Sequence, residues 1–335
     1  MAQTSKVAVV TGASAGVGRA TALAFARDGA AVALLARSAE RLDAAVNEIT
    51  ALGGTALALP VDVADPDQLA QAAAHIEEEL GPIDVWVNNA MVTVLSRAVE
   101  MTADEYRRVT EVSYLGTVYG TLTALQYMRA RNRGVIVQVG SALAYRGIPL
   151  QSAYCAAKFA VRGFTDSVRV ELIYENSPIH LTMVQLAAFN TPQFQWARHR
   201  QSAQPQPLPP IFQPELAAKA IVWASKHRRR ELYVGFPALK TIVGNKLFPG
   251  LADRMAARQG FTGQMDFSVP PPAPADQRDD NLFTPVSGDY GSHGRFDERA
   301  TDWSLQFWLS IHRGAVTGAL LLILVLGLLL WLFID

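Results

Sequence analysis

The chain has 335 residues, of which 50% are hydrophobic and 18% are charged, and its 30 lysines and arginines balance its 30 aspartates and glutamates. Disordered chains need low hydrophobicity, and nucleic-acid-binding domains need an excess of positive charge, so the composition excludes both classes. We therefore expect a globular protein with a sizeable core and no nucleic-acid partner.

Residues 6–235 alternate short β-branched runs with longer amphipathic or alanine-rich stretches. This alternation is typical of βαβ units, which build a parallel sheet covered by helices. The predicted fold class is therefore α/β, a doubly wound, Rossmann-like parallel sheet with its ligand crevice at the carboxyl ends of the strands. We expect seven strands, at residues 7–10, 31–35, 55–59, 85–88, 134–139, 180–185 and 231–234, with helices between them, for example at 18–28 and 39–52.

The first predicted strand leads into a glycine-rich turn, TGASAGVG at residues 11–18, which opens a predicted helix. Glycines in this context let the backbone approach a pyrophosphate placed at the helix N-terminus. At the end of the second predicted strand stands Arg37, with no acidic residue beside it. A guanidinium suits a 2′-phosphate, whereas a carboxylate would bind a ribose 2′-hydroxyl, so the sequence favours NADP(H) over NAD(H). The alternative is that Arg37 is a solvated loop residue.

Tyr154 and Lys158 are four residues apart, which places a phenol and an amine on one face of a predicted helix. A nearby ammonium lowers the pKa of a phenol, so that the phenol can exchange a proton with a substrate hydroxyl near neutral pH. Taken alone, this spacing is common on helix surfaces. Ser141, at the end of the fifth predicted strand, strengthens the catalytic interpretation, because its hydroxyl lies where the crevice is expected.

Five motifs occur together in one order: TGASAGVG at 11–18, Asp62-Val63, Asn88-Asn89-Ala90, Ser141, and YCAAK at 154–158. In this combination the chain resembles the short-chain dehydrogenase/reductase family over about residues 5–235. The resemblance implies hydride transfer between NADP(H) and a carbonyl or secondary alcohol. It also implies a homo-oligomer, because the family commonly forms dimers or tetramers.

The resemblance assigns roles to individual residues. Tyr154 would be the general acid/base, Lys158 would lower its pKa and bind the nicotinamide ribose, and Ser141 would hold the substrate oxygen. The implied catalytic residues are Ser141, Tyr154, Lys158 and Ser113. The implied cofactor-binding residues are Gly12, Ser14, Gly16, Val17, Gly18, Arg37, Asp62, Val63, Asn89, Ala90, Tyr154, Lys158 and Thr191.

The chain departs from the family pattern at three places near the cofactor. Met91 stands where the family usually has glycine, Ser113 where it has the asparagine that orders a relay water, and Leu186-Ala187 where it has Pro-Gly. These departures keep an alternative open, namely a catalytically weakened dinucleotide-binding membrane protein that senses redox state or recruits partners.

The segments expected to surround the substrate are residues 91–95, 143–150 and a proline-rich flap at 193–213. They are mainly apolar or aromatic, which favours a hydrophobic steroid-, retinoid- or lipid-like substrate. The alternative is that these side chains only pack the flap. Six dispersed histidines and one cysteine show no metal-ligand spacing, so we expect no metal.

We expect a catalytic domain at 1–260, a linker rich in glycine and proline at 261–312, and a transmembrane helix at 313–333. Residues 314–333 carry no charge and are long enough to cross a bilayer. The N-terminus shows no signal peptide. With His312 and Arg313 flanking the span, the positive-inside rule predicts a single-pass C-terminal membrane anchor with the catalytic domain facing the cytoplasm. The lone Cys155 agrees with a reducing compartment.

Overall fold

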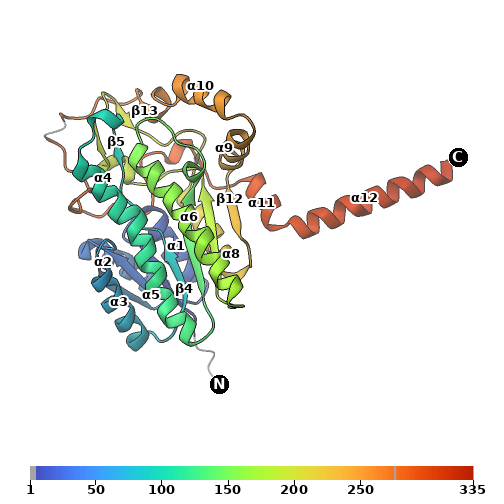
Figure 1. Cartoon of the computed structure of the whole chain (residues 1–335), viewed down its shortest axis with the longest axis horizontal. Helices are drawn as coiled ribbons and strands as arrows, with labels where there is room; N and C mark the ends of the chain where they lie inside the picture. The colour runs from blue at the N-terminus through green and yellow to red at the C-terminus, as the bar shows by residue number, and fades with distance from the viewer. Residues whose placement is uncertain (1–4, 275–276, 335) are drawn as a thin grey trace.

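The computed structural model describes residues 5–274 and 277–334, and its centre is a seven-stranded sheet (Figure 1). The strands of this sheet are β1 (Val7–Thr11), β2 (Ala31–Ala36), β3 (Ala56–Pro60), β4 (Ile83–Asn88), β6 (Val135–Ser141), β7 (His180–Leu186) and β12 (Glu231–Val234). They lie in the order β12-β7-β6-β4-β1-β2-β3, and every neighbouring pair is parallel. The predicted doubly wound sheet of seven parallel strands is therefore confirmed.

Helices cover both faces of the sheet. One layer holds α1 (Gly16–Arg27), α2 (Ala39–Ala51) and α8 (Pro214–Lys226), and the other holds α3 (Pro66–Glu79), α5 (Gly116–Ala130) and α6 (Ser152–Tyr174). The remaining helices are α4 (Ala103–Thr110), α7 (Gln193–Trp196), α9 (Phe236–Leu247), α10 (Pro249–Gln259), α11 (Leu305–Ile311) and α12 (Arg313–Ile334). A π-helical turn, Glu111–Leu115, joins α4 to α5.

The strands are apolar on both faces because helices bury both faces. In β1, Ala8 and Val10 belong to the core cluster under α1, α2 and α8, whereas Val7 and Val9 belong to the opposite cluster. All four side chains are almost fully buried. Side chains alternate between the two faces of a strand, so a strand buried on both sides loses the polar alternation of a half-exposed strand.

Short strands cover the crevice at the carboxyl ends of the main sheet. β8 (Ala188–Phe189), β11 (Ile211–Phe212) and β14 (Ala300–Thr301) form one small sheet, and β10 (Gln204–Pro205) pairs with β13 (Met265–Asp266). β5 (Val94–Leu95) pairs with β9 (Arg198–His199). The predicted flap therefore contributes strands that pair with segments on either side of it.

The segment predicted as a linker lies against the domain. β13 and β14 pair with β10 and β11, two strands of the flap, and buried Asp266 forms ion pairs with Arg295 and Arg299. Residues 281–291, which we call the C-terminal strap, contact the end of β2 and the start of α1 through backbone carbonyls. Packing of this kind leaves no hydrophobic period in the sequence, because much of it uses backbone atoms.

The last helix, α12, extends away from the folded body (Figure 1). The backbone of this helix is described, but the side chains of residues 320, 323, 325 and 327–334 lie outside the described part of the chain. Among the described residues, no helix is both long and apolar enough to cross a bilayer. The described residues therefore give no support to the predicted transmembrane helix at 313–333, and the predicted single-pass membrane localisation facing the cytoplasm is wrong. The described start of α12, residues 313–319, consists mainly of small or polar residues, which supply little of the hydrophobicity that a span requires.

A buried polar network ties the centre of the sheet to α5. The Asn88 amide donates to Thr121 Oγ1 at 3.0 Å and to Gln138 Oε1 at 2.9 Å, and it accepts from Trp86 Nε1 at 2.9 Å. Gly120 is required beside it, because a β-carbon there would lie 2.3 Å from Asn88 Oδ1. Every member of the network has a partner, so the loss of one leaves buried polar atoms unpaired.

Asn88→Ala should lower the free energy of unfolding by about 2 to 4 kcal/mol, because Trp86 Nε1 and Gln138 Oε1 lose their partners in the core. Urea denaturation measures the change. Asn47→Ala, on the exposed face of α2, is the matched control and should have little effect. Equal stability of the two variants would contradict a stabilising role for this network.

Candidate active site

A cavity of about 350 Å³ opens at the carboxyl ends of the central strands. Three of the four predicted catalytic residues line it, namely Ser141, Tyr154 and Lys158, whereas Ser113 does not. All of the predicted cofactor-binding residues line it: Gly12, Ser14, Gly16, Val17, Gly18, Arg37, Asp62, Val63, Asn89, Ala90, Tyr154, Lys158 and Thr191. Residues from seven distant stretches of the sequence are thus brought to one cavity.

The turn between β1 and α1 needs its glycines for two different reasons. Gly12 and Gly16 adopt φ values of 67° and 57°, a region that disfavours residues with a side chain. Gly18 sits so close to the turn that a β-carbon there would lie 2.1 Å from the Gly12 carbonyl oxygen. The backbone is therefore compact at the start of α1, and helix N-termini of this kind are favourable places for an anion.

Thr11 joins this turn to the end of β4, a role that the sequence analysis did not assign. Its hydroxyl donates to the Val87 carbonyl at 3.2 Å and accepts from the N–H groups of Asn89 and Ala90 at 2.9 and 3.1 Å. The Asn89 amide returns a bond of 2.9 Å to the Thr11 carbonyl. These contacts hold the two loops of the cavity floor together.

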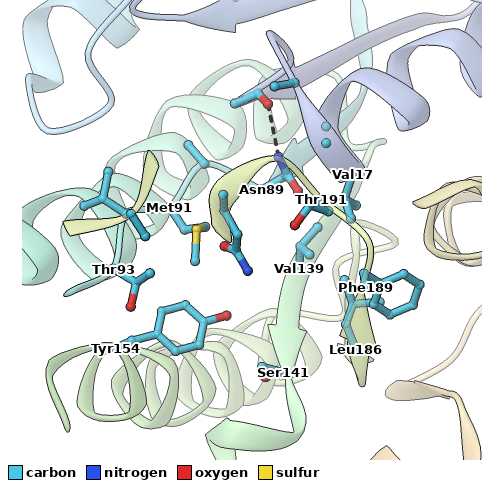
Figure 2. A pocket seen from close by; sticks show the side chains of 18 of the residues that line it. Val17, Asn89, Met91, Thr93, Val139, Ser141, Tyr154, Leu186, Phe189 and Thr191 are labelled. Atoms are coloured by element: carbon cyan, nitrogen blue, oxygen red, sulfur yellow. Dashed lines mark hydrogen bonds between the residues drawn. The ribbon is translucent and has the colours of Figure 1, made fainter. Parts of the chain in front are cut away.

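Ser141 ends β6, and Tyr154 and Lys158 lie one turn apart on α6. In Figure 2 the Tyr154 hydroxyl points into the cavity, with Ser141 and Met91 nearby. The Lys158 ammonium lies 5.6 Å from the centre of the Tyr154 ring and donates to the Val139 carbonyl at 2.7 Å. The three side chains therefore meet at one end of the cavity, with the glycine-rich turn elsewhere on its wall.

Burial moves the pKa values of the two central groups in opposite directions. Burial raises the pKa of the Tyr154 phenol, the neighbouring Cys155 adds to the rise, and a hydrogen bond with Ser141 opposes it. Burial lowers the pKa of Lys158 to about 8. In both cases the apolar surroundings disfavour the charged form. Tyr154 is therefore a protonated phenol at neutral pH, and Lys158 is an ammonium close to its titration point.

Ser113 lies inside the π-helical turn and is fully buried. Its hydroxyl donates to the Val92 carbonyl at 2.9 Å and accepts from the Val92 N–H at 3.1 Å. It therefore fastens the loop after β4 to the helix.

The other two departures line the cavity. Met91 faces it across from Tyr154 (Figure 2). Neither Leu186 nor Ala187 has a positive φ, so the backbone at these two positions does not require glycine. Ala187 also donates its N–H to the Val234 carbonyl at 3.2 Å, which anchors it to the neighbouring strand.

Two arginines border the cavity beyond β2. Arg37 is half-buried and donates through Nη1 to the Phe283 carbonyl at 2.8 Å. Arg41, on the first turn of α2, is buried and donates through Nε to the Gly288 carbonyl at 2.7 Å. Burial is the main cause that lowers the pKa of each. The sequence analysis missed Arg41, which follows Arg37 by four residues and lies on the first turn of α2.

Comparisons with known proteins agree with this geometry. The family model described as short chain dehydrogenase matches residues 6–202. The uncharacterised oxidoreductase YxnA of Bacillus subtilis is 34% identical over 261 residues, which cover 77% of this chain and 73% of that protein.

Two solved structures are also similar. An alcohol dehydrogenase from Thermococcus sibiricus, complexed with 5-hydroxy-NADP, is 27% identical with a TM-score of 0.60, over 68% of this chain and 95% of that one. A metagenomic short-chain oxidoreductase in complex with NADP is 27% identical with a TM-score of 0.58, over 68% and 96% of the two chains.

Lys158→Met should stabilise the cofactor-free protein at pH 7 by about 1 to 3 kcal/mol, because it removes a buried ammonium. The folded pKa of Lys158, about 8, lies below its ordinary 10.5, so the charge destabilises the fold fully below pH 8. The advantage of the variant should shrink as pH rises from 8 to 10.5. Urea denaturation at several pH values measures it, with exposed Lys219→Met as the control. A difference that does not change with pH would contradict the shift.

Proposed function

Because this chain belongs to the short-chain dehydrogenase family, we propose that it is an NADP(H)-dependent oxidoreductase acting on a carbonyl or secondary alcohol of a hydrophobic substrate. The observation that carries the proposal is the convergence of Ser141, Tyr154 and Lys158 on a cavity that the glycine-rich turn also lines. One cavity therefore combines a turn that suits a dinucleotide with side chains that can transfer a proton.

The residues present fit a dinucleotide that carries a 2′-phosphate. The compact glycine turn leaves room for a pyrophosphate, and Arg37 stands where the 2′-position is read at the end of β2. Among the described residues, neither Arg37 nor Arg41 forms an ion pair with a carboxylate. Two guanidinium groups, one half-buried and one buried, with which no described carboxylate pairs directly, favour a dianionic ligand. The NADP complexes of the solved relatives support the same choice.

NADP(H), when bound, supplies or accepts the hydride. In the reducing direction the Tyr154 phenol donates its proton to the substrate oxygen as charge develops there. The Ser141 hydroxyl hydrogen-bonds the same oxygen and orients it. The Lys158 ammonium stabilises the phenolate that remains on Tyr154. In the oxidising direction the phenolate accepts the proton of the alcohol.

The substrate end of the cavity supports an apolar ligand. Its lining includes Leu143, Ile148, Phe194 and Leu208, and the short sheets of the flap lie over it. Thr93 and Gln151 are polar members of the same lining. We propose a steroid-, retinoid- or lipid-like carbonyl or alcohol, because such a ligand buries its surface against these side chains.

The sensor alternative rested on the three departures from the family pattern. Ala187 needs no positive φ, and the Ser113 hydroxyl is engaged in closing the loop at Val92. No observation on the described residues favours a binding-only protein over an enzyme, and the complete Ser141, Tyr154 and Lys158 set favours catalysis.

Tyr154→Phe should reduce turnover of NADPH with apolar ketones and aldehydes by at least about 10²-fold, because it removes the proton donor. Dinucleotide binding, followed by NADPH fluorescence, should persist. Tyr174→Phe, exposed at the end of the same helix, is the control and should leave turnover unchanged. NADPH binding without turnover of any carbonyl or alcohol in the wild type would overturn the enzyme proposal.

Arg37→Asp should weaken NADPH binding by about 10²-fold and NADH binding much less, because a carboxylate repels the 2′-phosphate. Fluorescence titration with each dinucleotide measures both constants. Arg254→Asp, exposed on α10, controls for the change in net charge. If the NADPH/NADH preference of Arg37→Asp equals that of the wild type, Arg37 does not read the 2′-position.

A further inference from the structure

The C-terminal strap binds both arginines at the 2′-phosphate end of the cavity. Arg37 donates to the carbonyls of Asn281 and Phe283, and Arg41 donates to those of Val286 and Gly288. At its end the strap accepts a bond of 3.1 Å from the Gly16 N–H to the Gly291 carbonyl. One short segment therefore reaches both basic side chains and the glycine-rich turn.

These contacts orient the two guanidinium groups without neutralising them. Peptide carbonyls carry no net charge, and within the described ranges no carboxylate is paired with Arg37 or Arg41. Repulsion from Arg108 and Arg41 lowers the pKa of Arg37 further after burial, while Asp62 opposes this. Two like charges that repel each other at the edge of one cavity favour an anion between them, and the strap keeps them in place for one.

The strap leaves donors free for that anion. A guanidinium has five N–H groups. In the described contacts, the strap uses Nη1 and Nη2 of Arg37 and Nε and Nη2 of Arg41. Nε of Arg37 and Nη1 of Arg41 make no hydrogen bond there. A phosphate can therefore bind both arginines while the strap stays in place.

The strap is anchored on both sides of these contacts. Leu282 is fully buried in the cluster that includes Val63 and Val112, two residues that line the cavity. Asp289 forms an ion pair with buried Arg19 on α1. Its neighbour Tyr290 lies 5.0 Å from the Arg41 guanidinium.

Trp196, on α7, contacts both the strap and Arg41. Its ring is 4.8 Å from the Arg41 guanidinium and packs edge-on against Tyr290, and its carbonyl accepts from the Asn281 N–H at 3.2 Å. Aromatic rings attract a guanidinium, so these contacts fix the position of Arg41.

We propose that the C-terminal strap is the outer wall of the 2′-phosphate site and that Arg41 is a second specificity-determining residue, which the strap positions. The dinucleotide binds beneath the strap, and exchange requires the strap to lift. This inference rests on the proposed NADP(H) function but assigns a role to a segment outside the matched residues 6–202. Asp289 and Tyr290 are positioning residues, because they act through the strap and Arg41.

The first test uses Asp289→Asn in the full chain, which removes the charge that holds the strap to Arg19. We expect the NADPH dissociation constant and dissociation rate to rise about 10-fold, and those of NADH to change less than about 2-fold. Fluorescence titration and stopped-flow displacement measure them. Asp302→Asn is the matched control, because this carboxylate is exposed and makes no ion pair among the described residues.

The second test asks whether Asp289 acts through Arg41. Arg41→Gln should also weaken the binding of NADPH more than that of NADH. The NADPH dissociation constant of the double variant should not exceed the larger of the two constants measured for the single variants. Additive losses would show that the two residues act independently and would overturn the positioning role. Thermal unfolding of each variant shows whether it folds.

A third measurement needs no variant. Chymotrypsin cleaves after aromatic residues, and Phe283 and Tyr290 are partly exposed in the strap. Cleavage after Phe283 and Tyr290 in the wild type should become several-fold slower with NADPH and change less with NADH. The 2′-phosphate binds Arg37 and Arg41, and these arginines hold the strap. Faster cleavage with NADPH, or tighter NADPH binding by Asp289→Asn, would mean that strap and cofactor compete and would overturn the proposal.

Equal losses of NADPH and NADH would reveal a merely structural strap and would also overturn the proposal. So would binding and cleavage that do not change. A wild type that binds neither dinucleotide would instead refute the proposed function, so the two failures are distinguishable.

Discussion

The hydroxyl of Thr11 holds together the two loops on which the site depends. It bonds the end of β1 to the end of β4, and the two loops then approach so closely that Gly12 has no room for a β-carbon beside Ala90. Parallel strands bring their carboxyl ends to one edge, but this does not by itself fix how the loops beyond them meet. The Thr11 side chain fixes how the two loops contact each other, and this contact forms the floor of the cavity.

The parts of the fold and site that could be predicted from the sequence are those with local patterns. The seven strands follow from apolar runs, and Tyr154 and Lys158 share a face because their spacing is one helical turn. The glycine-rich turn could likewise be predicted from the sequence, since only glycine tolerates the φ of Gly12 and the crowding at Gly18. These residues required no knowledge of distant contacts.

The parts that could not be predicted depend on distant contacts or on environment. Arg41 became significant only when a segment some 245 residues away covered it, and that segment binds it through carbonyl oxygens that every residue carries. Ser113 was expected near the proton relay, yet a π-helical turn directs its hydroxyl to Val92. The membrane anchor was inferred from a long uncharged apolar run and the basic residues that precede it, and the described residues contain no helix that meets the requirement.

Electrostatics gives the site its chemical asymmetry. Burial keeps a proton on Tyr154 and brings Lys158 close to losing one, so the apolar walls that we propose for the substrate also shift the pKa values of the two groups that would act on it.

The ion pair between Arg19 and Asp289 joins residues 270 positions apart. Arg19 lies near the beginning of the chain, and on a ribosome it emerges long before its partner does. The sheet can assemble while the chain is still growing, but the wall beside β2 must wait for residues 281–291, which are made after β12, the last strand of the main sheet. Completion of the nucleotide pocket is therefore a late event in the synthesis of this protein. A chain that stalls before the strap is made would carry a formed sheet in which Arg37 and Arg41 lack the strap carbonyls that bind them.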